Sequence, residues 1–259
     1  MSNSNEPILN KLFKDSNTYI EKAITTNKEE FIKVVESRRS VRIYDNTQVK
    51  EEDMLKCLEL ALLSPNSSNL QPWEFYWVKD PLKKEKLIDY CLGQPAAKTA
   101  QELIVCVARP DNWQENTQSM LNMFKEKELP EAVSTYYKKI VPLAYNQGFL
   151  GLFGIVKKIS TFFIGLKRSI PREPTSINDM KIWAHKSTAL ACQTLMLSLR
   201  AFGYDSCPME GIDSFRIKKL LKLPKKAQIC MVISAGKRAS NGVYGKRFRL
   251  ERERFIKII

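Results

Sequence analysis

The feature that most constrains the fold is a long apolar stretch at residues 181–202, KIWAHKSTALACQTLMLSLRAF. It is rich in Ala and Leu, and its apolar residues lie almost all round a helical projection, which predicts a central, buried helix. Gly203 follows directly, and glycine is the usual residue after a helix C-terminus because it adopts left-handed backbone angles without steric cost. The rest of the chain must therefore pack around this helix.

Three short β-prone runs are far apart in the sequence and are bounded by polar or turn residues. They are WEFYWV at 73–78, ELIVCVA at 102–108 and QICMVISAG at 228–236. Helical spacing of apolar residues predicts two more helices, at 28–38 and 50–63, each with acidic residues in its first turn. We therefore expect a sheet assembled from separated segments, with helices around it.

Length and composition indicate one folded domain over residues 1–259, since 44% of the residues are apolar and 10% are aromatic. Within it, residues 1–27 form a polar N-terminal extension without the pattern of a secretory signal, so we expect a cytoplasmic protein. The six cysteines occur singly, without a CxxC pair or zinc-ligand spacing, which indicates reduced thiols and no metal site.

A change in composition at residues 110–178 predicts a helical insertion, which could be a lid or a partner-contact region. Lys157 and Lys158 interrupt its apolar run FLGLFGIVKKISTFFIGLKRS, which argues against a membrane-spanning helix. An apolar face with basic residues would suit a helix at a membrane surface, placed at 148–168. Packing over the active site or over a partner subunit is the preferred interpretation.

The net charge of +14 raises the question of nucleic-acid binding, because clustered basic residues attract polyanions. The basic residues are instead scattered among acidic ones, and no recognition helix, zinc finger or RNP-type strand is evident. We expect a small-molecule ligand and no nucleic acid.

One basic cluster stands out. Arg38, Arg39, Ser40 and Arg42 place three guanidinium groups and a hydroxyl at the end of a predicted helix. Guanidinium groups bind phosphate oxygens with paired, charge-assisted hydrogen bonds, so a phosphate would stabilise this cluster. A solvated basic helix end is the alternative.

Three further segments resemble parts of a binding site. The loop SPNSSNLQPW at 64–73 carries small polar side chains that would let the backbone approach a flat ligand. The segment GYDSCPMEG at 203–211 is predicted to be a tight turn after the long helix, and YGKRFR at 244–249 adds a second basic cluster. Taken alone, each could be an ordinary turn or a solvated tail.

In their order along the chain, RRSVR, SPNSSNLQPWEF, GYDSCPMEG and KRFR resemble the FMN-dependent nitroreductase family, over most of residues 31–250 except 110–178. The resemblance implies an α+β fold with a central, mostly antiparallel sheet flanked by helices. It also implies a homodimer with long helices at its interface and an FMN site shared between the subunits.

The resemblance assigns cofactor-binding roles to individual residues. Arg38, Arg39, Ser40 and Arg42 match the segment for the FMN phosphate, with arginine at 42 where many members have lysine. The other matched positions are the partner-facing loop (Pro65, Asn66, Ser67, Asn69, Gln71), the turn against the flavin ring (Pro208, Met209, Glu210, Gly211), the C-terminal basic pair (Arg247, Arg249), and, more weakly, Gln94, Lys186 and Ser187.

The implied reaction moves hydride from NAD(P)H through flavin N5 to a nitroaromatic, quinone or enone by a ping-pong mechanism. No side chain is expected to be catalytic, and a backbone NH near Glu210 or Gly211 would contact N5. The single histidine, His185, leaves no hydrolytic triad and is expected to pack on its helix. The alternatives are a reductive dehalogenase-like enzyme and a flavin-binding protein without useful turnover.

Overall fold

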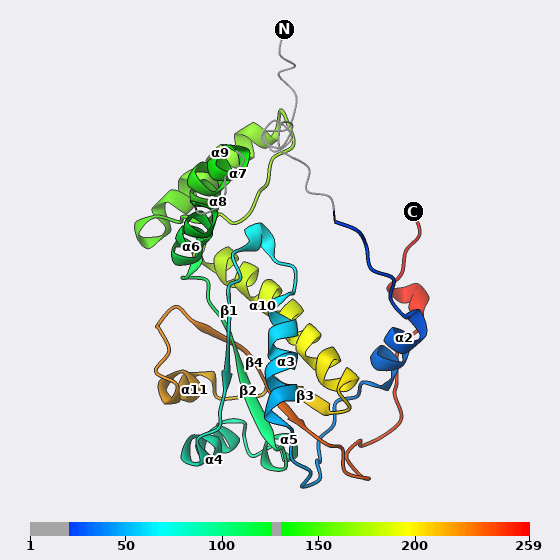
Figure 1. Cartoon of the computed structure of the whole chain (residues 1–259). Coiled ribbons are helices and arrows are strands. Elements are labelled where there is room, and N and C mark those ends of the chain that lie inside the picture. The colour runs from blue at the N-terminus through cyan, green and yellow to red at the C-terminus, as the bar shows by residue number, and fades with distance from the viewer. Residues whose placement is uncertain (1–20, 126–130) are drawn as a thin grey trace.

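The computed structural model describes residues 21–125 and 131–259, and a four-stranded sheet lies at its centre (Figure 1). The strands are β1 (Trp73–Trp77), β2 (Glu102–Ala108), β3 (Asp205–Met209) and β4 (Gln228–Gly236), in the order β1-β2-β4-β3, and every neighbouring pair is antiparallel. The three predicted strands and the α+β, antiparallel fold are confirmed.

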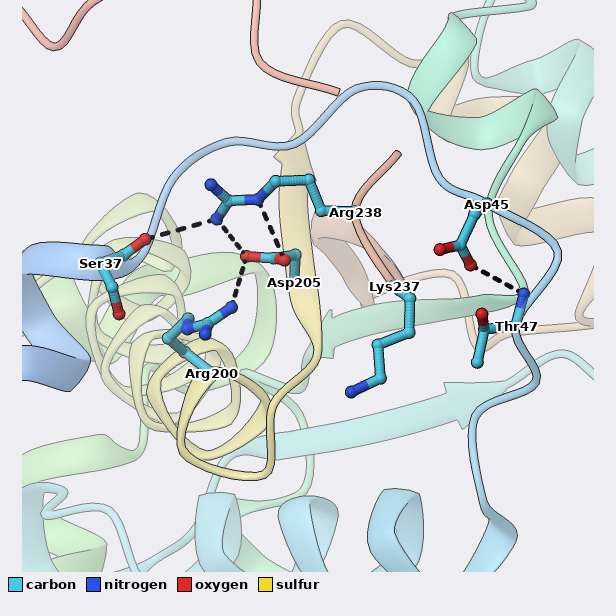
Figure 2. A pocket seen from close by; sticks show the side chains of 7 residues that line it. All are labelled: Ser37, Asp45, Thr47, Arg200, Asp205, Lys237 and Arg238. Carbon is cyan, nitrogen blue, oxygen red and sulfur yellow. Dashed lines mark hydrogen bonds and ion pairs between the residues drawn. The ribbon is translucent and has the colours of Figure 1, made fainter. Parts of the chain in front are cut away.

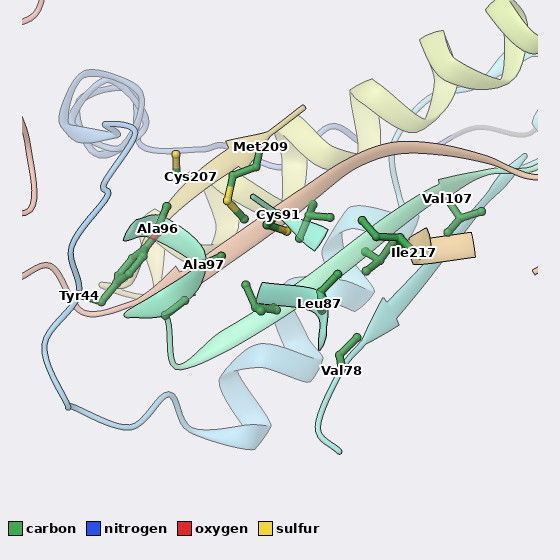
Figure 3. Packing of buried hydrophobic residues seen from close by; sticks show 14 of the residues in the cluster. Tyr44, Val78, Leu87, Cys91, Ala96, Ala97, Val107, Cys207, Met209 and Ile217 are labelled. Carbon is green, nitrogen blue, oxygen red and sulfur yellow. The ribbon is translucent and has the colours of Figure 1, made fainter. Parts of the chain in front are cut away.

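Alternation of side chains along β2 divides the core into two layers. Leu103, Val105 and Val107 face helices α4 (Pro81–Tyr90), α5 (Pro95–Lys98) and α11 (Ser214–Leu220), as Figure 3 shows in part. Ile104 and Cys106 face the opposite layer, formed by α3 (Glu51–Leu62) and α10 (Ile177–Ala201). Successive residues of a strand point to opposite faces, so this apolar run is buried from both sides.

Helix α10 is the long helix predicted at 181–202, and it begins four residues earlier. Ser176 caps its N-terminus by accepting a hydrogen bond from the backbone NH of Asp179, and Gly203, with φ of +80°, follows its C-terminus. Leu195 and Leu199 are fully buried under the sheet. Ile182 and Leu190 are about half exposed, so in the single chain the prediction that α10 is buried on all sides is wrong for the side of the helix that carries these two residues.

The prediction of a tight turn at 203–211 is also wrong, because residues Asp205–Met209 form edge strand β3. Its sequence, DSCPM, has no β-branched residue and contains proline, so local propensity does not indicate a strand. Pairing with β4, from Asp205 opposite Gly236 to Met209 opposite Val232, decides the conformation. Only Glu210 and Gly211 remain as the turn beyond the strand.

The insertion forms a group of short helices at the N-terminal end of α10 (Figure 1). A separate apolar cluster, including Trp113, Tyr145 and Trp183, joins this group to α10. Its elements are α6 (Trp113–Lys125), α7 (Glu131–Thr135), the π-helical turn η2 (Tyr136–Ile140), α8 (Val141–Tyr145), η3 (Phe149–Gly151) and α9 (Leu152–Gly165).

Helix α2 (Lys28–Ser37) precedes the basic cluster, and none of its ten residues is buried. In the predicted N-terminal extension, residues 21–27 are coil, and residues 1–20 lie outside the described residues. Two short 3-10 helices, η1 (Ser67–Asn69) and η4 (Arg252–Arg254), complete the elements. Within the described ranges, no single helix is long and apolar enough to cross a membrane. The bent pair Val133–Tyr145 and Phe149–Gly165 meets the length and composition criteria only in combination, at 65° to each other.

Candidate flavin phosphate site

A basic cavity of about 260 Å³ lies between the segment after α2 and the C-terminal segment. Residues about 200 positions apart in the sequence form its walls, so only the folded chain brings them together. The lining residues are Arg38, Arg39, Ser40, Arg42, Val243, Tyr244, Gly245, Lys246, Arg247, Phe248 and Arg249.

Backbone carbonyls hold the two basic segments against each other. Arg247 Nη2 donates to the carbonyl of Arg38 at 2.5 Å, and Arg39 Nη2 donates to the carbonyl of Gly245 at 2.5 Å. The Arg42 guanidinium lies 5.2 Å from the ring centroid of Tyr244, within cation–π range. Each of the two hydrogen bonds uses one N–H donor of its guanidinium group, so Arg39 and Arg247 have further donors for a ligand.

The electrostatics of the cavity favour an anion. Burial lowers the pKa of Arg38, and the positive charges of Arg247 and Arg249 lower it further. This direction means that the cluster is repulsive, and a bound dianion such as a phosphate monoester would relieve the repulsion. Arg249 also lines the cavity, so both arginines of the predicted C-terminal pair reach the predicted phosphate segment.

Strand β3 connects this cavity to the predicted flavin-ring turn. Ser40 forms a parallel β-bridge with Ser206, and the NH of Val41 donates to the carbonyl of Ser206 at 3.1 Å. From Ser206 the chain continues for five residues to Gly211, roughly 17 Å at the rise of an extended strand. A phosphorylated chain attached to a flat ring can span such a distance along a strand.

Gln94 is part of the same arrangement. Its Nε2 donates to the carbonyl of Gly211 at 2.8 Å and to the carbonyl of Cys91 at 3.0 Å. The side chain thus orients the end of the segment 208–211, in which Pro208 is half-buried, Met209 is buried and Glu210 is exposed. Gln94, one of the more weakly matched cofactor positions, is therefore adjacent to the turn predicted to face the ring.

A second cavity, of about 420 Å³, lies beside the start of β3, where Asp205 is one of its lining residues (Figure 2). Its buried carboxylate, Asp205, accepts from Arg200 Nη1 at 3.1 Å and from Arg238 Nη2 at 2.6 Å. Because these charges pair with one another, we assign them to positioning the start of β3 beside Ser40. The remaining lining residues are Ser37, Asp45, Thr47 and Lys237.

The predicted flavin loop, residues 65–71, is not brought to the basic cavity within one chain. Pro72 accepts a hydrogen bond from Thr188 in α10, whereas the cavity lies near the strand that follows Ala201. Thr188 and Ala201 are thirteen residues apart on α10, which corresponds to roughly 20 Å along the helix axis. Pro65, Asn66, Ser67, Asn69 and Gln71 therefore lie together, apart from the arginines of their own chain.

The backbone of this loop is unusual. Ser68, Asn69 and Gln71 have positive φ values of 58°, 50° and 45°, in the left-handed region that non-glycine residues rarely adopt. Asn66 stabilises the turn by accepting from the NH of Gln71 at 2.7 Å through Oδ1. The asparagine at position 66 thus has a local structural role in addition to any contact with a ligand.

Sequence reasoning missed the residues that support this loop. Ser68 Oγ lies 2.6 Å from Tyr136 Oη, and Tyr137 Oη donates to the Ser68 carbonyl at 3.0 Å. These tyrosines belong to the insertion, about 70 residues away in sequence, and no local pattern indicates the contact. Of the weakest predicted candidates, Lys186 is exposed on α10 and Ser187 is buried.

Comparison with known proteins identifies the family. The model of the family described as "Nitroreductase family" matches residues 35–125 and 170–237. The chain is 28% identical over 211 residues to Protein DrgA of Synechocystis, covering 81% of this chain and 84% of that protein. It is 29% identical over 217 residues to an NADH dehydrogenase of Thermus thermophilus, covering 83% and 90%.

Solved structures agree in fold. A protein of Exiguobacterium sibiricum in complex with FMN superposes with a TM-score of 0.67 at 23% identity, covering 92% of this chain and all of that one. A Nitroreductase Family Protein from Streptococcus pneumoniae also gives 0.67, at 17% identity, covering 88% of this chain and 100% of that one. The resemblance inferred from the four motifs is confirmed: this chain belongs to the nitroreductase family.

Proposed function

We propose that this chain is an FMN-dependent oxidoreductase that transfers hydride from NAD(P)H to a small oxidised acceptor. The observation that carries the proposal is the convergence of Arg38, Arg39 and Arg42 with Arg247 and Arg249 around one cavity. Family membership and the FMN complex of a structural relative support the identity of the ligand.

The residues present fit FMN. Its phosphate requires several cationic donors, and the lowered pKa of the half-buried Arg38, caused first by burial and then by cationic neighbours, marks a site that an anion would stabilise. Its ring requires a close backbone approach, which Gly211 provides two residues beyond β3, with the Gln94 amide as a polar neighbour. Under this proposal, Ser40 adds a hydroxyl donor to the phosphate.

Bound FMN would supply the hydride-transfer chemistry, and the protein would supply position and electrostatics. A backbone NH of Glu210 or Gly211 would point toward the ring nitrogen N5. The guanidinium groups of Arg38 and Arg42 would provide positive potential beside the polar edge of the ring. Donor and acceptor would occupy the same ring face in turn, which gives ping-pong kinetics.

We propose further that the active form is a homodimer with each FMN site shared between subunits. The loop 65–71 is anchored beside Thr188, whereas the arginines lie beyond the C-terminus of α10, roughly 20 Å away along the helix axis, so we propose that the loop contacts the flavin of a second chain. Ile182 and Leu190 on α10, and Phe31 and Val35 on α2, expose apolar surface that a second chain would cover.

The names of sequence relatives support the donor. One relative is an NADH dehydrogenase, and the name of YdgI from Bacillus subtilis, 28% identical over 230 residues and covering 88% of this chain and 97% of that protein, describes an NAD(P)H nitroreductase. We propose a nitroaromatic, quinone or enone as acceptor. We also propose a reducing compartment, the cytoplasm, because all six cysteines are free thiols.

A visible absorption spectrum of the purified protein tests the proposal. The apoprotein, mixed with excess FMN and passed through a gel-filtration column, should retain the chromophore, whereas riboflavin, which lacks the phosphate, should be lost. Anaerobic NADH or NADPH should then bleach the bound flavin, and a nitroaromatic, quinone or enone should restore its colour. A colourless protein after reconstitution would overturn the proposal.

Two further measurements define the reaction and the assembly. Faster reoxidation by a halogenated phenol than by any nitro compound would indicate the dehalogenase-like alternative, and bound flavin that neither nucleotide bleaches would indicate a protein without turnover. Dilution below the dimer dissociation constant should release FMN. A monomer that retains FMN would contradict the shared site.

A further inference from the structure

Helix α9 has its apolar side facing away from the protein. Phe162 and Phe163 are 55% and 62% exposed, near the C-terminal end of a 14-residue helix with only one buried residue, Gly154. At 100° per residue, the exposed apolar side chains fall within a stripe about 120° wide. They are Leu152, Ile155, Val156, Ile159, Phe162, Phe163 and Leu166.

Polar groups attach the opposite side of α9 to the protein. Lys157 Nζ donates to the carbonyls of Ala144 at 2.7 Å and Pro174 at 3.0 Å. Gly154 packs so closely that a Cβ there would lie 2.4 Å from the carbonyl oxygen of Thr175. A surface helix of a globular protein normally has the reverse orientation, so this one is docked to present apolar residues outward.

The chain segment that carries this stripe has only basic charged residues. The sequence has no Asp or Glu from residue 132 to residue 172. On the helical projection Lys158 and Lys167, both exposed, flank the two edges of the apolar stripe. The basic residues of the segment are Lys138, Lys139, Lys157, Lys158, Lys167, Arg168 and Arg172.

Family membership does not account for this surface, because the family match omits residues 126–169. We propose that α9 docks on the surface of a bilayer containing anionic lipids, lying in the interface plane. An apolar stripe between lysines matches the acyl and headgroup regions of a membrane surface. The phenylalanines can enter the acyl boundary while the ammonium groups remain among the lipid phosphates. The helix is far shorter than the ~20 residues needed to span a membrane.

Charge complementarity favours an anionic bilayer surface over a second copy of the chain as the partner of α9. The protein carries a net charge of +14, and a basic segment without acidic residues would repel the same segment of an identical partner pressed against it. Anionic lipid headgroups attract it instead, by about fivefold in partition coefficient for each lysine near the surface. The proposal is independent of the flavin chemistry.

Vesicle co-sedimentation of the full-length protein tests the proposal. The protein should sediment with vesicles of phosphatidylcholine and phosphatidylglycerol at least about tenfold better than with phosphatidylcholine alone, and added salt should reduce the difference. The double variant Phe162→Ser/Phe163→Ser should lower binding about tenfold or more. Phe215→Ser, at a side chain 77% exposed on α11, is the matched control and should bind like the wild type.

The charge requirement has its own variant. Lys158→Glu/Lys167→Glu should abolish the preference for phosphatidylglycerol, and both sites are exposed, so the fold should persist. Light scattering after size exclusion measures the oligomeric state of every variant. Two results would overturn the proposal: no vesicle binding by the wild type, or phenylalanine variants that bind vesicles normally but dissociate a dimer, which would make α9 an interface between copies.

Discussion

Ser68 Oγ lies 3.0 Å from the phenolic oxygen of Tyr145, although the two residues are 77 positions apart in the sequence. Ser68 belongs to the loop proposed to reach the flavin of the partner, and Tyr145 belongs to the insertion. Burial raises the pKa of Tyr145, so its phenol remains protonated and can donate at neutral pH. The insertion therefore holds the left-handed turn at Ser68 in place.

Tyr145→Phe should loosen this loop while keeping the ring, which packs 4.7 Å from the Trp183 ring. Loss of one partly buried hydrogen bond should lower the free energy of unfolding by about 1 kcal/mol and weaken FMN binding by the dimer, because the loop becomes less ordered. Urea unfolding and FMN fluorescence titration measure the two effects. Ser160→Ala, at an exposed hydroxyl on α9, is the control, and equal effects of both variants would contradict this role of the phenol.

Arg247→Gln should raise the dissociation constant of FMN by roughly 10- to 100-fold, the range expected for one charge-assisted bond to phosphate. Riboflavin binding should be unchanged, because riboflavin lacks the phosphate. Flavin fluorescence quenching measures both ligands. Arg216→Gln, at an exposed arginine on α11, should leave both constants unchanged. A similar loss for riboflavin would show that Arg247 acts on the fold rather than on the phosphate.

Asp205→Asn should lower the free energy of unfolding by about 2–4 kcal/mol, since it leaves Arg200 and Arg238 without their buried carboxylate. Displacement of β3 from Ser40 should also weaken FMN binding. Glu59→Gln removes an exposed ion pair with Lys56 and should change stability by less than about 1 kcal/mol. Chemical denaturation distinguishes the two. Equal small effects would mean that the Asp205 cluster contributes no more than a surface pair.

Asp179 makes stability depend on acid pH. Burial alone would raise its pKa, but hydrogen bonds from Thr175 and Ser176 outweigh burial and lower it below the ordinary value. A folded pKa below the unfolded one gives stabilisation that is complete above the unfolded value, about 3.9, and is lost as pH falls through the folded value.

Asp179→Ala should therefore cost about 1 kcal/mol at pH 7, comparable with loss of a helix cap, and the difference from wild type should shrink in strong acid. Asp179→Asn keeps an acceptor oxygen and should lose less at neutral pH. Urea unfolding across the acid range provides the test. A difference that does not change with pH would exclude the carboxylate charge as the cause.

Local sequence was informative wherever one segment determines its own conformation. The runs 102–108 and 228–236 were predicted with the bounds that the structure shows, because apolar β-prone residues between polar ends can be recognised without their neighbours. The helices around residues 28–38 and 50–63 were predicted to within a residue or two for the same reason. Strand β3 was missed because only pairing with β4 stabilises it.

The sequence by itself determined three of the four strands, the long helix and the basic residue types suited to a phosphate, all of which depend on short-range patterns. Only the tertiary structure decided that residues 38–42 and 243–249 share a cavity, that Asp205 gathers two arginines, and that the loop 65–71 lies far from both. It alone showed which side of α9 faces solvent. The physical reason is that contacts between distant residues arise from packing of the whole chain, which no single segment encodes.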